Sequence, residues 1–457
     1  MIRPRPDQRY VVAAVYVAAM LMNTLDSTIV NVALATLGRE FGVPPATTEA
    51  VVVGYLVSLA VFIPASGWLG DRFGTKRVFL AALALFVLAS ALCGLAQSLE
   101  QLVAFRVLQG AGGGMLTPVG MAMLFRTFPP RERVAVGRVL MFATILGPAS
   151  GPIVGGVLIE RLSWRWAFYV NVPVGLTAFL IGLLFLREHR EPEPGGFDLP
   201  GFVLGGVGLA TAMFALSDGP GRGWSSPEIV AAAVVGVIAL VAFLMRELRA
   251  PEPMVDLRLL RNRLFRTTQV VSFFAAAGFV GVLFLIPLYL QTVRGASPLA
   301  AGLTTFPEAI GVVTSTQIVA RLYPRVGPRR LMVVGLLIVA SAIVLLAVVG
   351  LDGGPWTVRV LMFLVGAGMA CIFLPNQAAS LATISRAQTG RATTIANVQR
   401  QLGAAIGVAA LSSVLAAAGG AGGDAGVEAF RAALFVAATF AIVGALAAVR
   451  VPDEEAA

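Results

Sequence analysis

Three charged residues stand out because they lie inside long apolar stretches of the sequence. Asp26 is near the middle of the first stretch, Arg106 is in the fourth and Glu308 is in the tenth. A carboxylate inside a membrane is costly, and in transport proteins such a group commonly takes up and releases a proton. Arg106 is permanently charged, so it cannot carry a proton itself, but it can stabilise or sense the charge of a nearby carboxylate. We therefore predict proton coupling at Asp26, Arg106 and Glu308.

Each of these charges also has a purely structural interpretation. Asp26 could be a fixed, hydrogen-bonded brace of the first helix, and Arg106 could be a member of a static ion pair. Glu308 could select cationic substrates, act as a second proton site, or pair with Arg400. The sequence alone leaves these alternatives open.

Polar side chains near these charges are the predicted substrate contacts. Asn23, Asp26 and Asn31 share one arc of a helix at 100° per residue. That arc must face protein or a water-filled cavity, because lipid cannot satisfy it. The predicted substrate-binding residues are Asn23, Asn31, Tyr55, Gln109, Glu308, Asn376 and Gln377.

The elements that position these residues are predicted to cross a membrane. The chain has 457 residues, of which 58% are hydrophobic and 13% charged, which is too little polar surface to cover a soluble globule. Cutting the sequence at clusters of Gly, Pro and charge gives fourteen apolar runs of roughly 18 to 27 residues. Each run can cross a hydrocarbon core about 30 Å thick. We predict an all-α membrane protein with fourteen transmembrane helices.

The distribution of positive charge predicts the orientation of the chain. The net charge of +10 might suggest a nucleic-acid partner, but most of the 34 Lys and Arg residues lie on one side of the predicted spans. Cytoplasmic loops show this excess of Lys and Arg. We therefore predict a multi-pass protein of the cell membrane with both termini in the cytoplasm. The expected partner is the lipid bilayer, and we expect no nucleic acid.

The residues that usually carry enzymatic or metal chemistry are scarce. Cys93 and Cys371 lie in separate apolar runs and are interpreted as small buried side chains. The only histidine, His189, is in the charged linker REHREPEP, and the only lysine, Lys76, is in a predicted loop. A membrane enzyme or a proton-pumping respiratory subunit would need such groups within its site. We expect no enzyme activity, no metal and no cofactor; a channel stays possible from the span count alone.

Two similar charged stretches indicate an internal repeat. Gly67 to Arg77 (GWLGDRFGTKR) lies between two apolar runs and is predicted to be a tight loop in water. Ala320 to Met332 (ARLYPRVGPRRLM) repeats it, with Gly327 in the place of Gly74. A transporter built from two similar halves would show this pattern. In the same alignment Glu308 corresponds to Tyr55, which would place both near the axis between the halves.

The fifth apolar run contains the stretch Gly147 to Gly156, GPASGPIVGG. Two Gly-Pro pairs and a Gly-Gly pair weaken the local helix and flatten one face, so the segment can bend and pack closely. An ordinary seam of small residues would need neither the prolines nor this spacing.

Several of these motifs resemble those of the major facilitator superfamily, and they occur in its order along essentially the whole chain. Gly67 to Arg77 resembles the signature loop between helices two and three, and FRVLQGAGGG around Arg106 resembles the fourth-helix arginine motif. LDSTIVNVAL around Asp26 is similar to the first-helix motif of the fourteen-span drug:proton antiporters. Gly147 to Gly156 resembles the fifth-helix motif of exporters. Glu308 departs from the family, in which the position after this proline is usually small or apolar.

The resemblance implies a domain organisation. Residues 1–186 and 267–457 would form two pseudo-symmetric six-helix bundles. Residues 187–266 would contain a cytoplasmic linker, two inserted peripheral helices near 199–216 and 229–245, and an arginine-rich loop. The protein would be a monomer.

The resemblance also implies a function and a set of moving parts. The chain would export lipophilic compounds, cationic ones among them, in exchange for protons by alternating access; the alternative is a dedicated exporter of one natural product, peptide, amino acid or siderophore. Charges in the signature loop would form a cytoplasmic latch between the halves, or would only fix topology. The predicted gating residues are Gly67, Asp71, Arg72, Gly74, Arg77, Gly147, Gly151, Pro152, Gly155 and Gly156.

Overall fold

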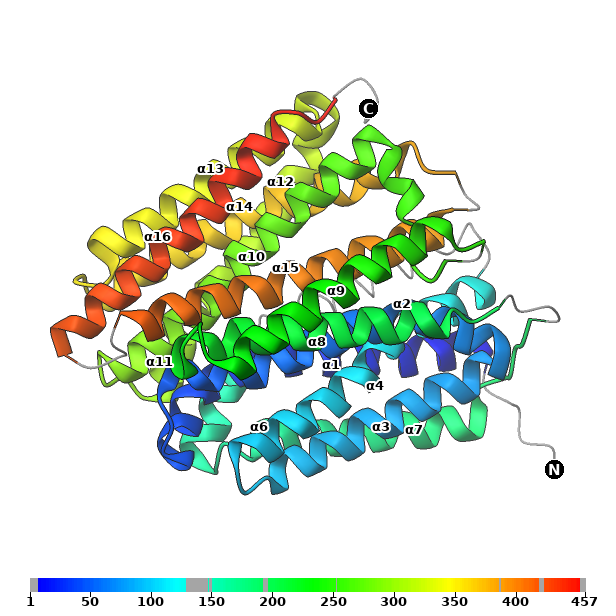
Figure 1. Cartoon of the computed structure of the whole chain (residues 1–457), viewed down its shortest axis with the longest axis horizontal. Coiled ribbons are helices and arrows are strands. Elements are labelled where there is room, and N and C mark those ends of the chain that lie inside the picture. The colour runs from blue at the N-terminus through cyan, green and yellow to red at the C-terminus, as the bar shows by residue number, and fades with distance from the viewer. Residues whose placement is uncertain are drawn as a thin grey trace.

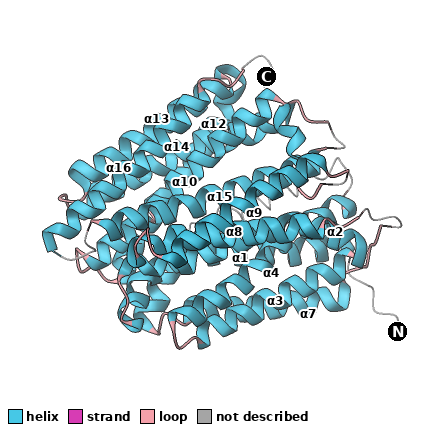
Figure 2. Cartoon of the chain, in the orientation of Figure 1, coloured by secondary structure: helices cyan, strands magenta, loops and turns pink. Residues whose placement is uncertain are grey.

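The computed structural model describes residues 7–128, 147, 150–191, 196–251, 253–385, 388–418 and 423–452. Within these ranges the secondary structure is helical, without strands (Figure 2). Eleven helices are long and apolar enough to cross a membrane. The helix at Leu99–Thr127, the pair at Pro298–Thr305 and Pro307–Val326, and the helix through residues 150–161 bring the number to the fourteen predicted. The first part of the fifth span, including Pro148 and Ala149, lies outside the described residues.

The helices form two bundles and an inserted hairpin (Figure 1). The N-terminal bundle contains α1 (Gln8–Phe41), α2 (Ala50–Phe73), α3 (Thr75–Leu95), α4 (Leu99–Thr127), the helix through 150–161, α6 (Trp166–Tyr169) and α7 (Asn171–Phe185). The hairpin is α8 (Leu199–Arg222) and α9 (Pro227–Arg249). The C-terminal bundle contains α10 (Arg263–Thr292), α11 (Pro298–Thr305), α12 (Pro307–Val326), α13 (Pro328–Leu345), α14 (Pro355–Ala382), α15 (Thr389–Ala417) and α16 (Gly423–Ala448).

Short polar residues begin several of these helices. The Ser98 side chain accepts from the Gln101 backbone N–H at the start of α4, and Asn262 caps α10 through the Phe265 N–H. These caps satisfy N–H groups that have no partner within the helix. Between the caps, the helices stay apolar enough to bury one face in a bundle and to leave the other in lipid.

The internal repeat predicted from the two charged stretches is confirmed by the backbone. α2 ends at Phe73 and α3 begins at Thr75, and the single residue between them, Gly74, has a φ of +100°. α12 ends and α13 begins around Gly327 in the same way, with a φ of +80°. The predicted extent of the loop is wrong, because residues 67–73 belong to α2. One left-handed glycine is enough to turn the chain.

The inserted hairpin packs against both bundles. α8 contacts α2 in the N-terminal bundle and α15 in the C-terminal bundle, and α9 packs on α8 (Figure 1). Ser413 on α15 donates a hydrogen bond to the Leu216 carbonyl oxygen at 2.9 Å. Most of α9 is exposed, as expected for a helix that faces lipid. α8 therefore bridges the bundles, while α9 forms the outer layer.

Candidate functional site

A buried ion pair lies inside the N-terminal bundle, between α1 and α4. Arg106 Nη1 is 2.5 Å from Asp26 Oδ2, and the two side chains are 1% and 0% exposed. Charges removed from water this completely need a close partner and further hydrogen bonds. The structure provides both.

The Asp26 carboxylate accepts two more hydrogen bonds. Gln109 Nε2 and Asn171 Nδ2 both donate to its Oδ1, at 2.9 and 2.7 Å. The same two amides also donate to Ser90 Oγ, at 3.1 and 3.0 Å, and Ser90 donates to the Phe168 carbonyl oxygen at 2.9 Å. The charged form of Asp26 is therefore compensated by one cation and two amide donors.

The guanidinium of Arg106 is held on several sides. It donates to the Gln109 side-chain oxygen at 2.7 Å and to the Val51 carbonyl oxygen at 3.2 Å. The Tyr55 ring stacks on it at 3.9 Å from Cζ to the ring centroid, and the Tyr55 hydroxyl donates to Asn23 Oδ1. Three predicted substrate residues, Asn23, Tyr55 and Gln109, thus lie around the ion pair rather than on an open surface.

Glycines on α4 bring α2 close enough to build this network. A Cβ at Gly110 would lie 2.5 Å from the Tyr55 carbonyl oxygen, and one at Gly113 would lie 2.9 Å from Asn23 Oδ1. A larger residue at Gly110 would push α4 away from α2, and one at Gly113 would push it away from Asn23 on α1. The glycine face of α4 therefore places Arg106 against the Tyr55 ring.

A second polar site lies at the seam between the two bundles. Glu308 and Asn31 line a small hollow of about 10 Å³, which has room for about one water molecule. The N-terminal bundle contributes four lining residues and so does the C-terminal bundle; the complete lining is Thr28, Asn31, Val32, Pro152, Leu283, Pro287, Thr305 and Glu308. Anything larger could enter only if the two bundles moved apart at this seam.

Glu308 differs from Asp26 in having no charged partner. Its side chain is 6% exposed, and within the described part of the chain no hydrogen bond or ion pair reaches its carboxylate. The Asn31 side-chain oxygen is also buried without a partner. Arg400 is exposed and donates to Asn397 at 3.2 Å, so the alternative of a Glu308–Arg400 pair is wrong in this structure.

Asn376 and Gln377 lie apart from both sites. Asn376 is half-buried with its side-chain oxygen unpartnered, and Gln377 is exposed. Both follow Gly366, which packs against the Glu308 backbone, by ten or more residues of α14. At 1.5 Å per residue this is a separation of about 15 Å. The structure does not bring them to Glu308.

The glycines of the fifth span pack on α1. A Cβ at Gly147 or Gly151 would overlap the side chain of Thr24 or Thr28, and one at Gly155 would lie 2.7 Å from Ile29 Cγ1. These positions are four residues apart, so they form one face of a helix. They let the fifth span lie directly against the helix that carries Asp26.

A neighbouring face of the fifth span, about 100° around the helix, meets the C-terminal bundle. A Cβ at Gly156 would lie 2.6 Å from Leu299 Cα, and the Pro152 carbonyl leaves no room for a side chain at Gly302. The Glu160 carboxylate accepts from the Leu299 backbone N–H at 3.2 Å. The predicted hinge segment is thus part of the contact between the bundles.

Other hydrogen bonds join the bundles at this same end. Gln291 donates to the Val32 carbonyl oxygen at 2.9 Å, and Ser412 donates to Glu49 Oε2 at 2.9 Å. Glu49 is 2% exposed even though it begins a helix. The bundles are therefore in contact at the end opposite to the one where α1 begins and α16 ends (Figure 1).

The charges on either side of the α2–α3 turn contact their own bundle and the linker. Asp71 pairs with Arg126 at 3.2 Å, Arg126 pairs with Glu191 at 2.6 Å, and Arg77 lies 3.6 Å from Glu188. The predicted latch between the two halves is therefore not formed by these pairs, whose partners come from α4 and from residues 188–191. Gly67 and Arg72 are exposed.

The family model described as Major Facilitator Superfamily matches residues 16–408 and, in a second match, 271–457. The chain belongs to the major facilitator superfamily. It is a multi-span membrane transporter with the fold of that family.

Relatives within the superfamily carry names that refer to drug resistance. The chain is 35% identical to a multidrug resistance protein B homolog of Mycobacterium tuberculosis over 88% of its length and 75% of the relative. It is 36% identical to a putative multidrug resistance protein MdtD of Serratia proteamaculans, over 76% and 72%.

Solved structures share the fold at lower identity. A peptide transporter POT in complex with sulfate has a TM-score of 0.72 at 15% identity, with 100% of this chain and 96% of that chain covered. A bacterial homolog of the human lysosomal transporter Spinster, inward-facing and unoccupied, has a TM-score of 0.66 at 18% identity, with 99% and 98% covered.

Sequence reasoning missed several residues of this superfamily member. Asn171 is not among the predicted site residues, although an amide within an apolar run was a usable signal. Ser90 gave no signal, because a single serine is common in membrane helices. Glu49 and Ser412 were missed because their contact joins two bundles that are far apart in sequence.

Proposed function

We propose that this transporter exports lipophilic compounds, cationic ones among them, across the cell membrane in exchange for protons. The similarity to proteins named for multidrug resistance supports the substrate class. The observation that carries proton coupling is the Asp26–Arg106 pair, which places a carboxylate and its counter-charge deep inside the N-terminal bundle. The proton gradient would drive the cycle without a cofactor.

Protonation of Asp26 is the proposed coupling step. A proton on this carboxyl removes the negative charge that faces Arg106. Arg106 then keeps its contacts with Gln109, the Val51 carbonyl oxygen and the aromatic rings of Tyr55 and Phe168. The tie between α1 and α4 weakens, which biases the bundle toward its other conformation. Loss of the proton to the opposite side restores the ion pair and completes the cycle.

Glu308 is proposed to meet the substrate or a second proton. It lies at the seam between the bundles, unpaired and beside a hollow the size of one water molecule. A drug-sized compound could reach it only after the bundles separate. A lone carboxylate exposed by that movement would favour cationic compounds, since no arginine balances it.

The closed end of the molecule supports alternating access. Contacts through Val32, Glu49 and Glu160 hold the bundles together there. We propose that this end is extracellular, that the termini are cytoplasmic, and that rocking of the two bundles opens each end in turn.

The test uses everted membrane vesicles with an acid interior and an internal pH dye. A panel of lipophilic cations and neutral drugs is added to wild type and to Asp26→Asn and Glu308→Gln. Wild type should release internal protons when a substrate is added, and Asp26→Asn should not. Glu308→Gln should lose the response to cations more than the response to neutral compounds.

The outcomes distinguish multidrug antiport from a dedicated exporter, and a coupling role of Asp26 from a structural one. If no compound releases protons from vesicles that contain folded wild-type protein, multidrug antiport is wrong and a dedicated exporter takes its place. If Asp26→Asn still exchanges protons for compounds, the coupling site is elsewhere and Asp26 is a brace.

A further inference from the structure

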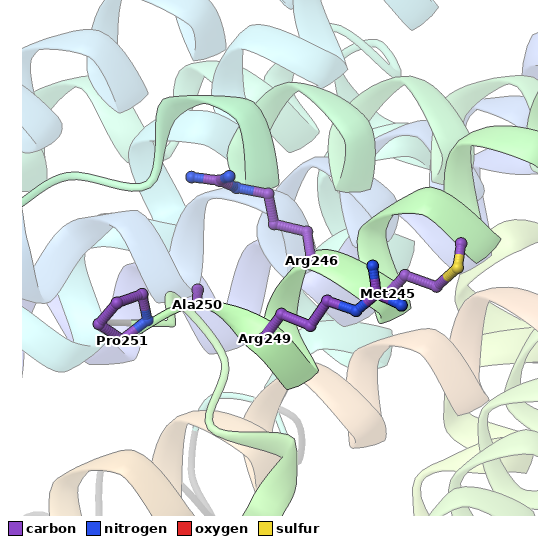
Figure 3. Close-up of a pocket in the computed structure, with 5 residues that line it drawn as sticks. All are labelled: Met245, Arg246, Arg249, Ala250 and Pro251. Atoms are coloured by element: carbon purple, nitrogen blue, oxygen red, sulfur yellow. The ribbon is translucent and has the colours of Figure 1, made fainter.

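A basic hollow lies at the base of the inserted hairpin, on the outer side of the molecule. It has a volume of about 320 Å³ and is lined by Met245, Arg246, Arg249, Ala250 and Pro251 (Figure 3). These residues form the last turn of α9 and the turn that follows it. α9 ends on the side of the molecule where α1 begins (Figure 1), and the hollow lies at that end of α9.

Two arginines present unused donors to this hollow. Arg246 Nε is 2.8 Å from Asp198 Oδ1, and the side chain of Arg246 is 44% exposed. Arg249 is exposed and forms no hydrogen bond or ion pair with the described residues. Figure 3 shows the Arg246 side chain extending toward the side of Ala250 and Pro251, while Arg249 extends back toward Met245. A site with this chemistry fits an anion.

Neighbouring groups do not satisfy these donors. Arg258 caps the end of α9 by donating to the Ala250 carbonyl oxygen at 2.9 Å, which removes an acceptor from the hollow. Glu247 is fully buried, and its carboxylate accepts from the Val255 backbone N–H at 2.9 Å. Asp256 is buried and pairs with Arg391 at 3.1 Å. Of the three acids Asp198, Glu247 and Asp256, Asp198 is therefore the one that forms an ion pair with an arginine of the hollow.

The outer face of α9 leads into the hollow and is apolar. Exposed side chains at spacings of three and four residues form one stripe along the helix, namely Val230, Val234, Val237, Val241, Leu244 and Leu248. The stripe ends where Arg249 begins. A ligand that matches both parts has an anionic head and a long apolar tail.

We propose that this hollow binds the phosphate of an anionic phospholipid, with the acyl chains along the outer face of α9. Guanidinium groups bind phosphate with several charge-assisted hydrogen bonds, and basic pockets beside membrane helices bind anionic headgroups. The lipid belongs to the leaflet on the side of the termini. α8 contacts α2 and α15, and α9 packs on α8. A lipid bound at the end of α9 would therefore stabilise the position of α8 between the two bundles.

Lipid binding to the purified full-length protein tests this site directly and does not depend on efflux. Native mass spectrometry would count phosphatidylglycerol and phosphatidylcholine of equal chain length that stay bound in detergent. Arg246→Gln with Arg249→Gln should weaken phosphatidylglycerol binding by roughly tenfold and leave phosphatidylcholine unchanged. Arg222→Gln with Arg359→Gln removes the same charge at the opposite end of the molecule and should have no effect.

A second variant separates loss of lipid binding from loss of folding, and a competitor separates a lipid site from a site for soluble anions. Arg249→Gln alone breaks no bond in the structure, so it should lower phosphatidylglycerol binding several-fold without changing the melting temperature. Unchanged lipid selectivity in both variants would overturn the proposal. Displacement of the lipid by inorganic phosphate at equal concentration would also overturn it, because the hollow would then be a site for soluble anions.

Discussion

The Asp26–Arg106 pair shows how strongly two buried charges depend on each other. Loss of either charge alone leaves an uncompensated ion in the core, so Asp26→Asn or Arg106→Gln should each lower the free energy of unfolding by about 3–5 kcal/mol. The double variant should recover most of this loss, because two neutral amides can bond to each other and to Gln109. Thermal unfolding in one detergent measures the three variants, with exposed Glu100→Gln as the control.

The double variant also separates structure from function. If its stability recovers and its proton exchange is absent, Asp26 acts in coupling rather than only as a brace. Additive losses of stability in the double variant would mean that the two charges are not energetically coupled.

Substitution of Glu308 should affect stability differently, because no charged partner would be left uncompensated. Glu308→Gln replaces a buried carboxyl for which no described residue provides a hydrogen bond or a counter-charge, so the melting temperature should stay the same or rise. A fall as large as that of Asp26→Asn would reveal a hidden ion pair. The measurement is thermal unfolding of both variants side by side in the same detergent.

At the scale of single residues, the sequence indicated which polar groups are buried but not how they are grouped. Asp26, Arg106 and Gln109 could be chosen because a polar residue in an apolar run must be satisfied by protein or water. Asn31 shares the polar arc of α1 with Asp26, yet it lies at the seam with Glu308. This grouping depends on which helices pack beside α1 at each level. The periodicity of α1 alone does not give that information.

At the scale of the element, the turn between α2 and α3 depends on one glycine. Gly74 has a φ of +100°, and a Cβ there would overlap the Glu188 carboxylate. Gly74→Ala should therefore lower stability by about 1–2 kcal/mol or more. Gly67 is helical with open space around it, so Gly67→Ala should raise stability by roughly 0.5–1 kcal/mol.

The two alanine variants control for each other, since both glycines belong to the charged stretch from Gly67 to Arg77 and differ in backbone conformation and in the space around them. Thermal unfolding in detergent gives the sign of each change. Equal effects at the two positions would contradict the role assigned to the turn.

The same turn shows why the repeat could be predicted and the loop length could not. Matching residues at Gly74 and Gly327 indicated two similar halves, which the two left-handed glycines confirm. The charges between Gly67 and Arg77 suggested an irregular loop. Charged side chains can equally extend from a helix end into water, so composition did not determine where α2 ends.

At the scale of the whole molecule, the bundles meet through small residues and a few hydrogen bonds. Gly156 lies against Leu299 and Gly302 lies against Pro152, so backbones approach closely at this seam. Ser412 and Glu49 add a buried hydrogen bond beside it. These contacts place backbone against backbone at the seam, so a side chain added there would meet atoms that cannot rotate away.

Gly302→Val should therefore hold this end open while the protein stays folded. Its Cβ would overlap the Pro152 carbonyl, which belongs to the backbone and cannot rotate away. Spin labels at Glu40→Cys and Trp356→Cys, on the two bundles at this end, should move apart in a background without Cys93 and Cys371. Transport should stop, because a transporter that cannot close one end cannot alternate.

Gly390→Val is the matched control, because a Cβ at Gly390 has no neighbour within 4 Å. It should keep both the short label distance and transport. An unchanged distance in Gly302→Val would mean that α11 adjusts around the new side chain, and that the close contact of Gly302 with Pro152 is not what permits closure. A longer distance with normal transport would instead show that closure at this seam is not needed for the cycle, which would contradict alternating access through this end.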